Sequence, residues 1–211
     1  NGQEFDLLIR MDVPEGVPAF PRNGGGTLGF KYNPRYIDIK VRNFFDTEGQ
    51  WVTISELVAS ADVGEIVNLR DYLSRGLVAG TNTPLVGIPA FGARKEADGT
   101  IGVRVAFLSN NLREFNRGAA EPFFRTGPDD ELPKLVVNWN EIGADFGING
   151  TYTVENQNSF VFVYTDDQRN WRTVQVPING FSFTYVPEPA SMIALGSGLV
   201  GLLALRRRRS N

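Results

Sequence analysis

Short strand-like segments joined by turn dipeptides are the feature that most limits how this chain can fold. The segment "YIDIKVRNFF" alternates apolar and polar side chains, and "DTEG" separates it from the strand-like "QWVTI". Asp98-Gly99 lies between the two arms of "FGARKEADGTIGVRVAFL" and is a strong hairpin signal. "SFVFVYTDDQRNWRTVQVPI" predicts another hairpin across residues 166–170, and "FSFTYV" predicts a last strand. We therefore expect residues 1–185 to form one mainly β domain, an antiparallel β-sandwich or jelly-roll-like body.

Helical signals are few in this body. One helix is predicted where Asp62 and Glu65 have the spacing of a capping box. Apolar residues then recur on one side and a glycine can end the helix; these residues are Ile66, Leu69, Leu73 and Gly76. "SNNLREFNRG" predicts a short helical turn within 109–118, and the Pro- and Gly-rich residues 13–26 predict a long loop.

The composition excludes several classes of function. None of the 211 residues is Cys or His, so the chain can build no thiolate nucleophile, no Cys/His metal site and no Ser-His-Asp triad. The chain has 21 basic and 24 acidic residues, and its last 26 residues hold four of the arginines but only one glutamate. The body thus has a net charge of about −6, which argues against binding nucleic acid.

The C-terminal tail, residues 186–211, reads "VPEPASMIALGSGLVGLLALRRRRSN". Its 16 residues 190–205 carry no charge, and as a helix they would span about 24 Å, short of the ~30 Å hydrocarbon core of a bilayer. A cluster of four arginines follows: Arg206, Arg207, Arg208 and Arg209. Such a cluster anchors a membrane helix on its cytoplasmic side, and its long side chains help a short span to reach the interface. We therefore expect a transmembrane helix over 190–205 with the body outside.

That orientation requires an export signal. The first residues, "NGQEFDLLIR", have no basic start and no long apolar run, so we expect that a signal peptide has been removed or that the sequence is a fragment. Pro187 and Pro189 flank Glu188 and keep this segment extended at the bilayer surface, where an outward-facing processing enzyme can reach it. The alternative is a stiff linker that ends the last strand.

The order of these parts resembles the PEP-CTERM sorting domain of Gram-negative bacteria. The matching parts are the motif Pro187-Glu188-Pro189, a short apolar helix and the terminal arginine cluster, and they cover only about the last 25 residues. The resemblance implies recognition by an exosortase, an integral-membrane cysteine enzyme that cleaves near the motif. It also implies a cell that makes extracellular polysaccharide, in which such proteins join the envelope or the biofilm matrix.

Two residue patterns suggest phosphate or metal sites. Gly24, Gly26 and Gly29 match G-x-G-x-x-G, but no helix signal follows them, so we expect a flexible loop rather than a phosphate site. Acidic clusters occur at Asp46/Glu48, Asp129/Asp130/Glu131 and Asp166/Asp167. Calcium is the cation that such oxygen-rich loops bind, but none has the EF-hand pattern, and we expect solvated turns and no cofactor.

Carboxylates and tryptophans are the remaining candidates for sugar chemistry. Glu141 and Asp145, beside Trp139, are the pair that we name for glycoside hydrolysis, although a polar loop around a core tryptophan is the more ordinary interpretation. Trp51 and Trp171 each follow a turn, so either could stack on a sugar ring. Strand aromatics more often pack in a core or across strands.

Together these features predict an exported, non-enzymatic protein of the cell envelope or biofilm matrix with a structural or adhesive body. Its expected partners are an exosortase and the membrane, with no nucleic acid. The first alternative is a carbohydrate-binding module for extracellular polysaccharide. The second is a polysaccharide-degrading enzyme that works through two carboxylates.

Overall fold

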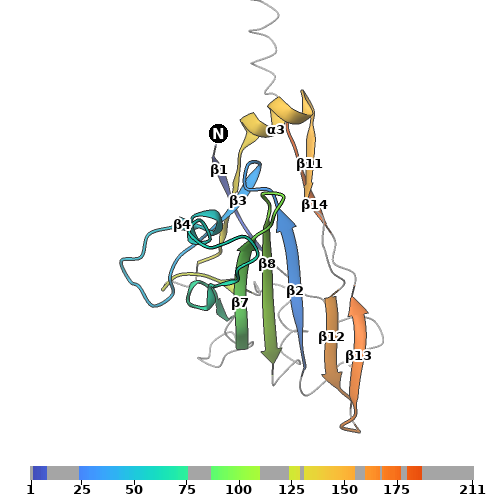
Figure 1. The fold of residues 1–211 in the computed structure, drawn as a ribbon. Coiled ribbons are helices and arrows are strands. Elements are labelled where there is room, and N and C mark those ends of the chain that lie inside the picture. The colour runs from blue at the N-terminus through green and yellow to red at the C-terminus, as the bar shows by residue number, and fades with distance from the viewer. Residues whose placement is uncertain are drawn as a thin grey trace, which may run out of the picture.

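Antiparallel strands make up most of the protein that the structure describes. The structure is a computed structural model and describes residues 2–8, 24–75, 87–109, 124–128, 131–154, 160–166, 168–176 and 180–186. Within these residues the strands form a six-stranded sheet, a four-stranded sheet and two two-stranded ribbons (Figure 1). The mainly β prediction is therefore confirmed.

The larger sheet has the strand order β13-β12-β2-β8-β7-β5. Its strands are β2 (Gly24–Tyr32), β5 (Val67–Asn68), β7 (Gly87–Lys95), β8 (Ile101–Ser109), β12 (Phe160–Thr165) and β13 (Trp171–Val176). The predicted hairpin at Asp98-Gly99 joins β7 to β8, and Gly99 has a φ of 80°, a conformation that glycine adopts readily. The predicted hairpin across 166–170 joins β12 to β13. Both hairpin predictions are confirmed.

The smaller sheet has the order β1-β10-β3-β4. Its strands are β1 (Gln3–Asp6), β3 (Ile37–Val41), β4 (Val52–Thr53) and β10 (Lys134–Val137). β3 and β4 pair antiparallel around the predicted "DTEG" turn, in which the Gly49 amide donates to the Asp46 carbonyl (3.0 Å). The ribbons are β6 (Ser74–Arg75) with β9 (Phe124–Arg125), and β11 (Thr151–Val154) with β14 (Phe181–Thr184).

One hydrophobic core joins the two larger sheets and the helices. Alternate side chains of β3 are buried, as are alternate side chains of β10, which is the pattern of strands with one face on the core. β7 and β8 contribute to the same cluster with Phe91, Ala93, Ile101, Val103 and Val105. Helices α1 (Ile54–Leu57) and α3 (Trp139–Phe146) each bury one isoleucine in it, Ile54 and Ile142.

The helix predicted to start at Asp62 is wrong. The Asp62 amide does donate to Glu65 Oε2 (2.9 Å), as the capping-box spacing suggested. The chain then forms β5 and the 3₁₀ helix η1 (Arg70–Tyr72), because Val67 pairs with Ala93 of β7. Tertiary pairing thus overrides the local helical pattern.

Two other features of the fold differ from the sequence predictions. Gly24 and Gly26 belong to β2 rather than to the end of a loop, and Gly29 lies in the same strand, so no helix follows this glycine pattern. Ser109 ends β8, and the rest of the second predicted helix, 110–118, lies outside the described residues.

The sandwich or jelly-roll arrangement and the transmembrane helix are not confirmed. Among the residues that the structure describes, no helix has both the length and the apolar character needed to cross a bilayer. The segment predicted to do so, 190–205, lies outside those residues.

Candidate functional site

The last described residues of the chain lie beside α3. β14 pairs with β11 from Phe181 opposite Val154 to Thr184 opposite Thr151. One residue further, the Tyr185 amide donates to the Gly150 carbonyl (2.8 Å). Val186 follows and is exposed. The residues predicted for sorting, which begin at Pro187, thus start directly after a backbone that is hydrogen-bonded to the α3 end of the protein (Figure 1).

Local signals in the sequence explain why α3 forms here. Asn138 accepts a hydrogen bond from the Glu141 amide (3.4 Å) at the start of the helix. Gly147, with a φ of 82°, ends it and donates to the Gly143 carbonyl. The polar loop expected around Trp139 is therefore wrong. The spacing of Asn138 and Glu141 was the signal for a helix start.

Small residues let α3 and the end of β14 approach closely. A Cβ added to Gly143 would lie 3.1 Å from the Tyr185 ring, so the ring packs on the helix backbone. A Cβ added to Gly150 would lie 2.4 Å from the Phe146 Cβ, which is too close to tolerate without a shift. These contacts fix the last described residues against the helix.

Aromatic rings fill the space between α3 and the strands. The rings of Tyr36 and Tyr152 lie 4.7 Å apart, and the Tyr36 and Phe146 rings lie 5.2 Å apart. The Tyr152 hydroxyl accepts a hydrogen bond from the Asn33 amide (2.8 Å), and burial raises the pKa of this tyrosine. Aromatic packing of this kind contributes about 0.5–1.5 kcal/mol per pair beyond the area that it buries.

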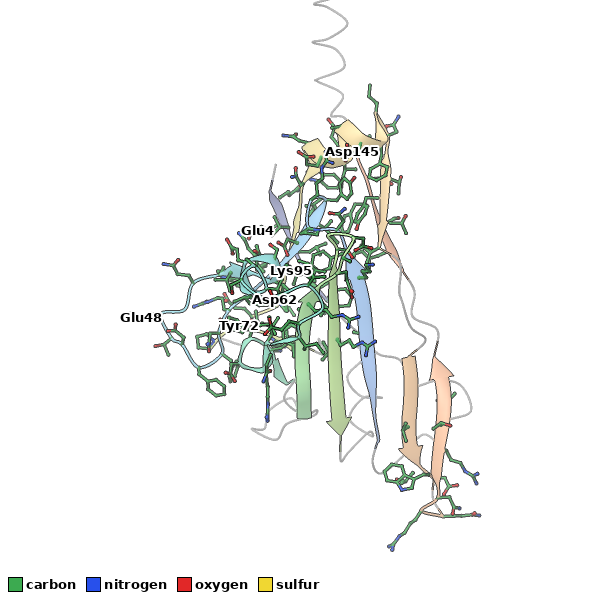
Figure 2. All side chains as sticks on the ribbon, viewed as in Figure 1. Glu4, Glu48, Asp62, Tyr72, Lys95 and Asp145 are labelled. Carbon is green, nitrogen blue, oxygen red and sulfur yellow. The ribbon has the colours of Figure 1, made fainter. Side chains whose placement is uncertain are left out.

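The two carboxylates named for glycoside hydrolysis are held by one arginine. Arg35 Nε donates to Glu141 Oε2 (2.6 Å), and Arg35 Nη2 donates to Asp145 Oδ1 (3.2 Å). The Tyr36 hydroxyl donates to the other oxygen of Asp145 (2.6 Å), and this hydrogen bond raises the pKa of Tyr36. Figure 2 shows Asp145 at the end of the molecule that α3 covers. The arrangement ties the residues before β3 to α3.

Trp51 lies in a cationic environment. The Arg42 guanidinium and the Lys134 ammonium each lie 5.8 Å from the Trp51 ring centroid. Arg42 also donates to the Gly49 carbonyl (3.0 Å) and to Glu131 Oε2 (2.8 Å). Trp51 is half-buried and engaged in cation–π contacts, so a sugar ring would have to compete with two side chains for its faces.

Trp171 differs in its surroundings. It begins β13 directly after the turn 166–170, pairs with Thr165 across the hairpin and is 67% exposed. Gln168, Arg169 and Arg172 around it are also exposed. An indole beside polar side chains is the arrangement that sugar stacking needs, and of the two tryptophans proposed for this role Trp171 is the more accessible.

The described residues of the acidic clusters include several that are bonded within the protein. Asp46 accepts from the Glu48 amide (3.0 Å), and Glu131 pairs with Arg42 (2.8 Å). Asp166 accepts from the amides of Gln168 and Asn170 and from Arg172, and these bonds hold its pKa below the ordinary value. Three further acidic residues of these clusters lie outside the described part of the chain: Asp129, Asp130 and Asp167.

The sorting residues also lie outside the described part. They are Pro187, Glu188, Pro189, Arg206, Arg207, Arg208 and Arg209. Val186 is the last residue that the structure describes. The structure thus shows which side chains surround Val186.

Comparison with protein families supports the resemblance found in the tail. The PEP-CTERM protein-sorting motif matches residues 186–209, the C-terminal region of the chain. The motif implies an exported protein that is sorted by an exosortase and processed at its C-terminus. The searches of curated proteins and of solved structures gave no match for this chain.

Proposed function

We propose that this protein is delivered to the cell envelope or biofilm matrix, where residues 1–185 act as a structural or adhesive body. The sorting-motif match at residues 186–209 is the observation that carries the proposal. The common core of the two larger sheets supports a sandwich-like body, and the start of the match directly after β14 supports a boundary at residue 185.

We assign three parts to the tail, residues 186–211. Pro187, Glu188 and Pro189 form the segment that the exosortase recognises. Residues 190–205 cross the membrane before processing, and the arginine cluster 206–209 stays on the cytoplasmic side because moving it across the bilayer is costly. The apolar composition of 190–205 and the run of four arginines after it support these roles.

Replacement of Pro187, Glu188 and Pro189 by alanine tests the sorting assignment. The full chain and this triple variant are each placed behind an export signal of a bacterium that has an exosortase, and both are expressed in that bacterium. The mass of the C-terminal peptide of the exported protein is then measured. We expect the parent chain to lose its C-terminal residues and the variant to keep them in the membrane fraction.

The matched control is Trp171→Ala, which changes an exposed residue outside the tail and should leave processing unchanged. Processing of the triple variant at the parental rate would contradict the assignment. In a host without exosortase, the parent chain should keep its C-terminus. If it also keeps its C-terminus in the host with an exosortase, the proposed sorting route as a whole is contradicted.

A second candidate function is binding of extracellular polysaccharide through Trp171. The exposure of this indole at the tip of the β12–β13 hairpin favours it. Stacking on a sugar ring would bury an apolar face that is now in water. Trp51 is the weaker of the two candidates because Arg42 and Lys134 lie over its ring.

Co-sedimentation of the processed protein with exopolysaccharide from the same host tests this candidate. We expect Trp171→Ala to lose most of the bound fraction and Trp51→Phe to keep it. Reducing-sugar release is measured in the same tube, with and without calcium. Binding that survives Trp171→Ala would remove the hairpin from the site, and sugar release would instead support an enzyme.

A further inference from the structure

Exposed apolar side chains lie at and beside Val186, the last residue that the structure describes. Phe146 ends α3 and is 45% exposed, Ile148 lies in the following turn and is 68% exposed, and Val186 is 67% exposed. We call these three residues the exit face. They are held together because Gly150 contacts Phe146 and accepts the hydrogen bond from the Tyr185 amide.

The exit face is a fixed part of the protein surface. The Gly147 amide donates to the Gly143 carbonyl, and the Gly150 amide donates to the Gly147 carbonyl (2.9 Å), so the turn that carries Ile148 is hydrogen-bonded to the helix. Ile142 of the same helix is fully buried in the core. Exposed apolar side chains that are gathered at one place on a fixed surface are the kind of feature that binds a partner.

The length of chain beyond Val186 limits what that partner can be. Ala190, where the uncharged segment begins, is four residues further on, so even a fully extended chain spans at most about 14 Å between them. The polar layer on each side of a bilayer is roughly 5–8 Å thick. Once residues 190–205 enter the hydrocarbon, the exit face must therefore lie at or near the headgroups.

The charges beside the exit face favour an apolar contact over an electrostatic one. Arg35 is ion-paired with both Glu141 and Asp145, which leaves this cluster with a net charge of only −1. An interfacial surface of this kind binds by placing apolar side chains at the boundary between headgroups and acyl chains.

We propose that the exit face is a membrane-contact surface that seats the folded body on the lipid surface into which the tail inserts. The proposal rests on the proposed function, since it requires the tail to be membrane-anchored before processing. Contact through Phe146, Ile148 and Val186 holds the Pro187–Pro189 segment along the headgroup layer. It orients the β12–β13 hairpin tip, at the opposite end of the molecule, away from the membrane (Figure 1).

Site-specific fluorescence in vesicles tests this proposal. The chain has no cysteine, so one introduced cysteine can carry an environment-sensitive dye. The first position is Ala144→Cys, exposed in the last turn of α3, and the second is Gln168→Cys, exposed at the hairpin tip. The full chain is reconstituted into phosphatidylcholine vesicles that contain some phosphatidylglycerol and quencher-bearing lipids. We expect strong lipid quenching and a blue shift at position 144, and neither at position 168.

Two substitutions with equal starting exposure separate lipid contact from general effects. Ile148→Ser in the Ala144→Cys protein should weaken the quenching and reduce the blue shift, because the tail still holds the exit face near the headgroups but one of its apolar contacts is lost. Ile66→Ser should leave both signals unchanged, because Ile66 is also 68% exposed but belongs to the turn before β5. Both variants should keep the melting temperature of the parent, since neither side chain is buried.

The other outcomes overturn the proposal in distinguishable ways. If the chain does not float with the vesicles, the anchored tail of the proposed function fails. If it floats but position 144 is not quenched, or if Ile148→Ser keeps the full quenching, the membrane-contact surface alone fails. If the blue shift of the dye at position 144 disappears when each vesicle carries only one chain, the exit face binds a second copy of the chain instead of lipid.

Discussion

The α3 end and the tip of the β12–β13 hairpin lie at opposite ends of the molecule and are stabilised in different ways (Figure 1). Each has a tight turn and one non-glycine residue with positive φ, Asn149 at 64° and Arg169 at 65°. The α3 end is attached to the core by Ile142, which is fully buried. At the hairpin tip, residues 168–173 are all exposed, and the described turn is held by hydrogen bonds to Asp166.

This difference separates two kinds of surface. Side chains at the α3 end are positioned by the whole fold, so their exposure is a property of the tertiary structure. Trp171 at the tip is positioned by a hairpin that is stabilised locally, so it can change with little effect on the rest of the protein. A contact that must hold the body in one orientation suits the first surface, and an adaptable ligand contact suits the second.

The largest expected difference between the two ends is in the cost of truncating one side chain. Ile142→Ala should lower the free energy of unfolding by about 2–5 kcal/mol, because it leaves a cavity under α3. Trp171→Ala should change it by no more than about 0.5 kcal/mol, because an exposed residue loses few contacts. Urea denaturation followed by circular dichroism measures both values. Equal losses would mean that the hairpin tip is not independent of the core.

The next effect tests how closely the α3 end is packed. Gly150→Ala should cost about 1–3 kcal/mol, since the new Cβ would lie 2.4 Å from the Phe146 Cβ and the backbone must move. Gly102→Ala in β8 is the matched control, because its nearest neighbour at 2.8 Å is the mobile end of the Glu96 side chain. Thermal unfolding of both variants measures the loss of stability that each substitution causes. A larger loss for Gly102→Ala than for Gly150→Ala would contradict the close approach at Gly150.

The sequence predicted the parts of the fold that depend on neighbouring residues. The hairpins at Asp98-Gly99 and 166–170 were found because each strand pairs with the next one along the chain. Val67 was assigned to a helix because its partner, Ala93, is distant in sequence and no local pattern reveals that pairing. The capping signals of α1 and α3 were present, as Thr53 with Glu56 and Asn138 with Glu141, but both segments were short enough to be read as strand or loop.

The candidate site was only partly predictable for a related reason. The tail was recognised because its apolar segment and arginine cluster are contiguous. The different environments of Trp51 and Trp171 depend on Lys134 and Arg42, which reach Trp51 through sheet pairing. The exit face could not be predicted, because Ile148 and Val186 come together only when β14 pairs with β11.

A smaller effect concerns the two residues with positive φ. Arg169→Gly should stabilise the protein slightly, by up to about 1 kcal/mol, because a side chain with a Cβ is strained in the left-handed region. Asn149→Gly should be close to neutral, since asparagine tolerates this conformation better. The pair of melting temperatures tests whether the tip turn is strained. A destabilised Arg169→Gly variant would show that the arginine side chain makes a contact that outweighs the strain.

The smallest expected effect is a local response of the hairpin tip to acid. Hydrogen bonds from the Asn170 amide, and then from Arg172, hold the pKa of Asp166 below its ordinary value of 3.8. A carboxylate whose pKa is lowered in the folded protein stabilises the fold above pH 3.8, and that contribution is lost as the pH falls through the folded pKa. Between about pH 5 and about pH 2, the NMR amide signals of Gln168 and Asn170 should therefore shift with a single titration.

The neutral cap of α3 provides the comparison for this titration. Asn138 has no charge to lose, so the Ile142 amide, which donates to the Asn138 carbonyl (3.1 Å), should move much less over the same range. Asp166→Asn should abolish the titration at the tip while the core signals stay in place. If the Asn170 amide still titrates in that variant, another acid controls the turn. If Ile142 moves as much as Asn170, acid affects both ends together, and the distinction between a core-anchored end and a locally stabilised tip does not hold.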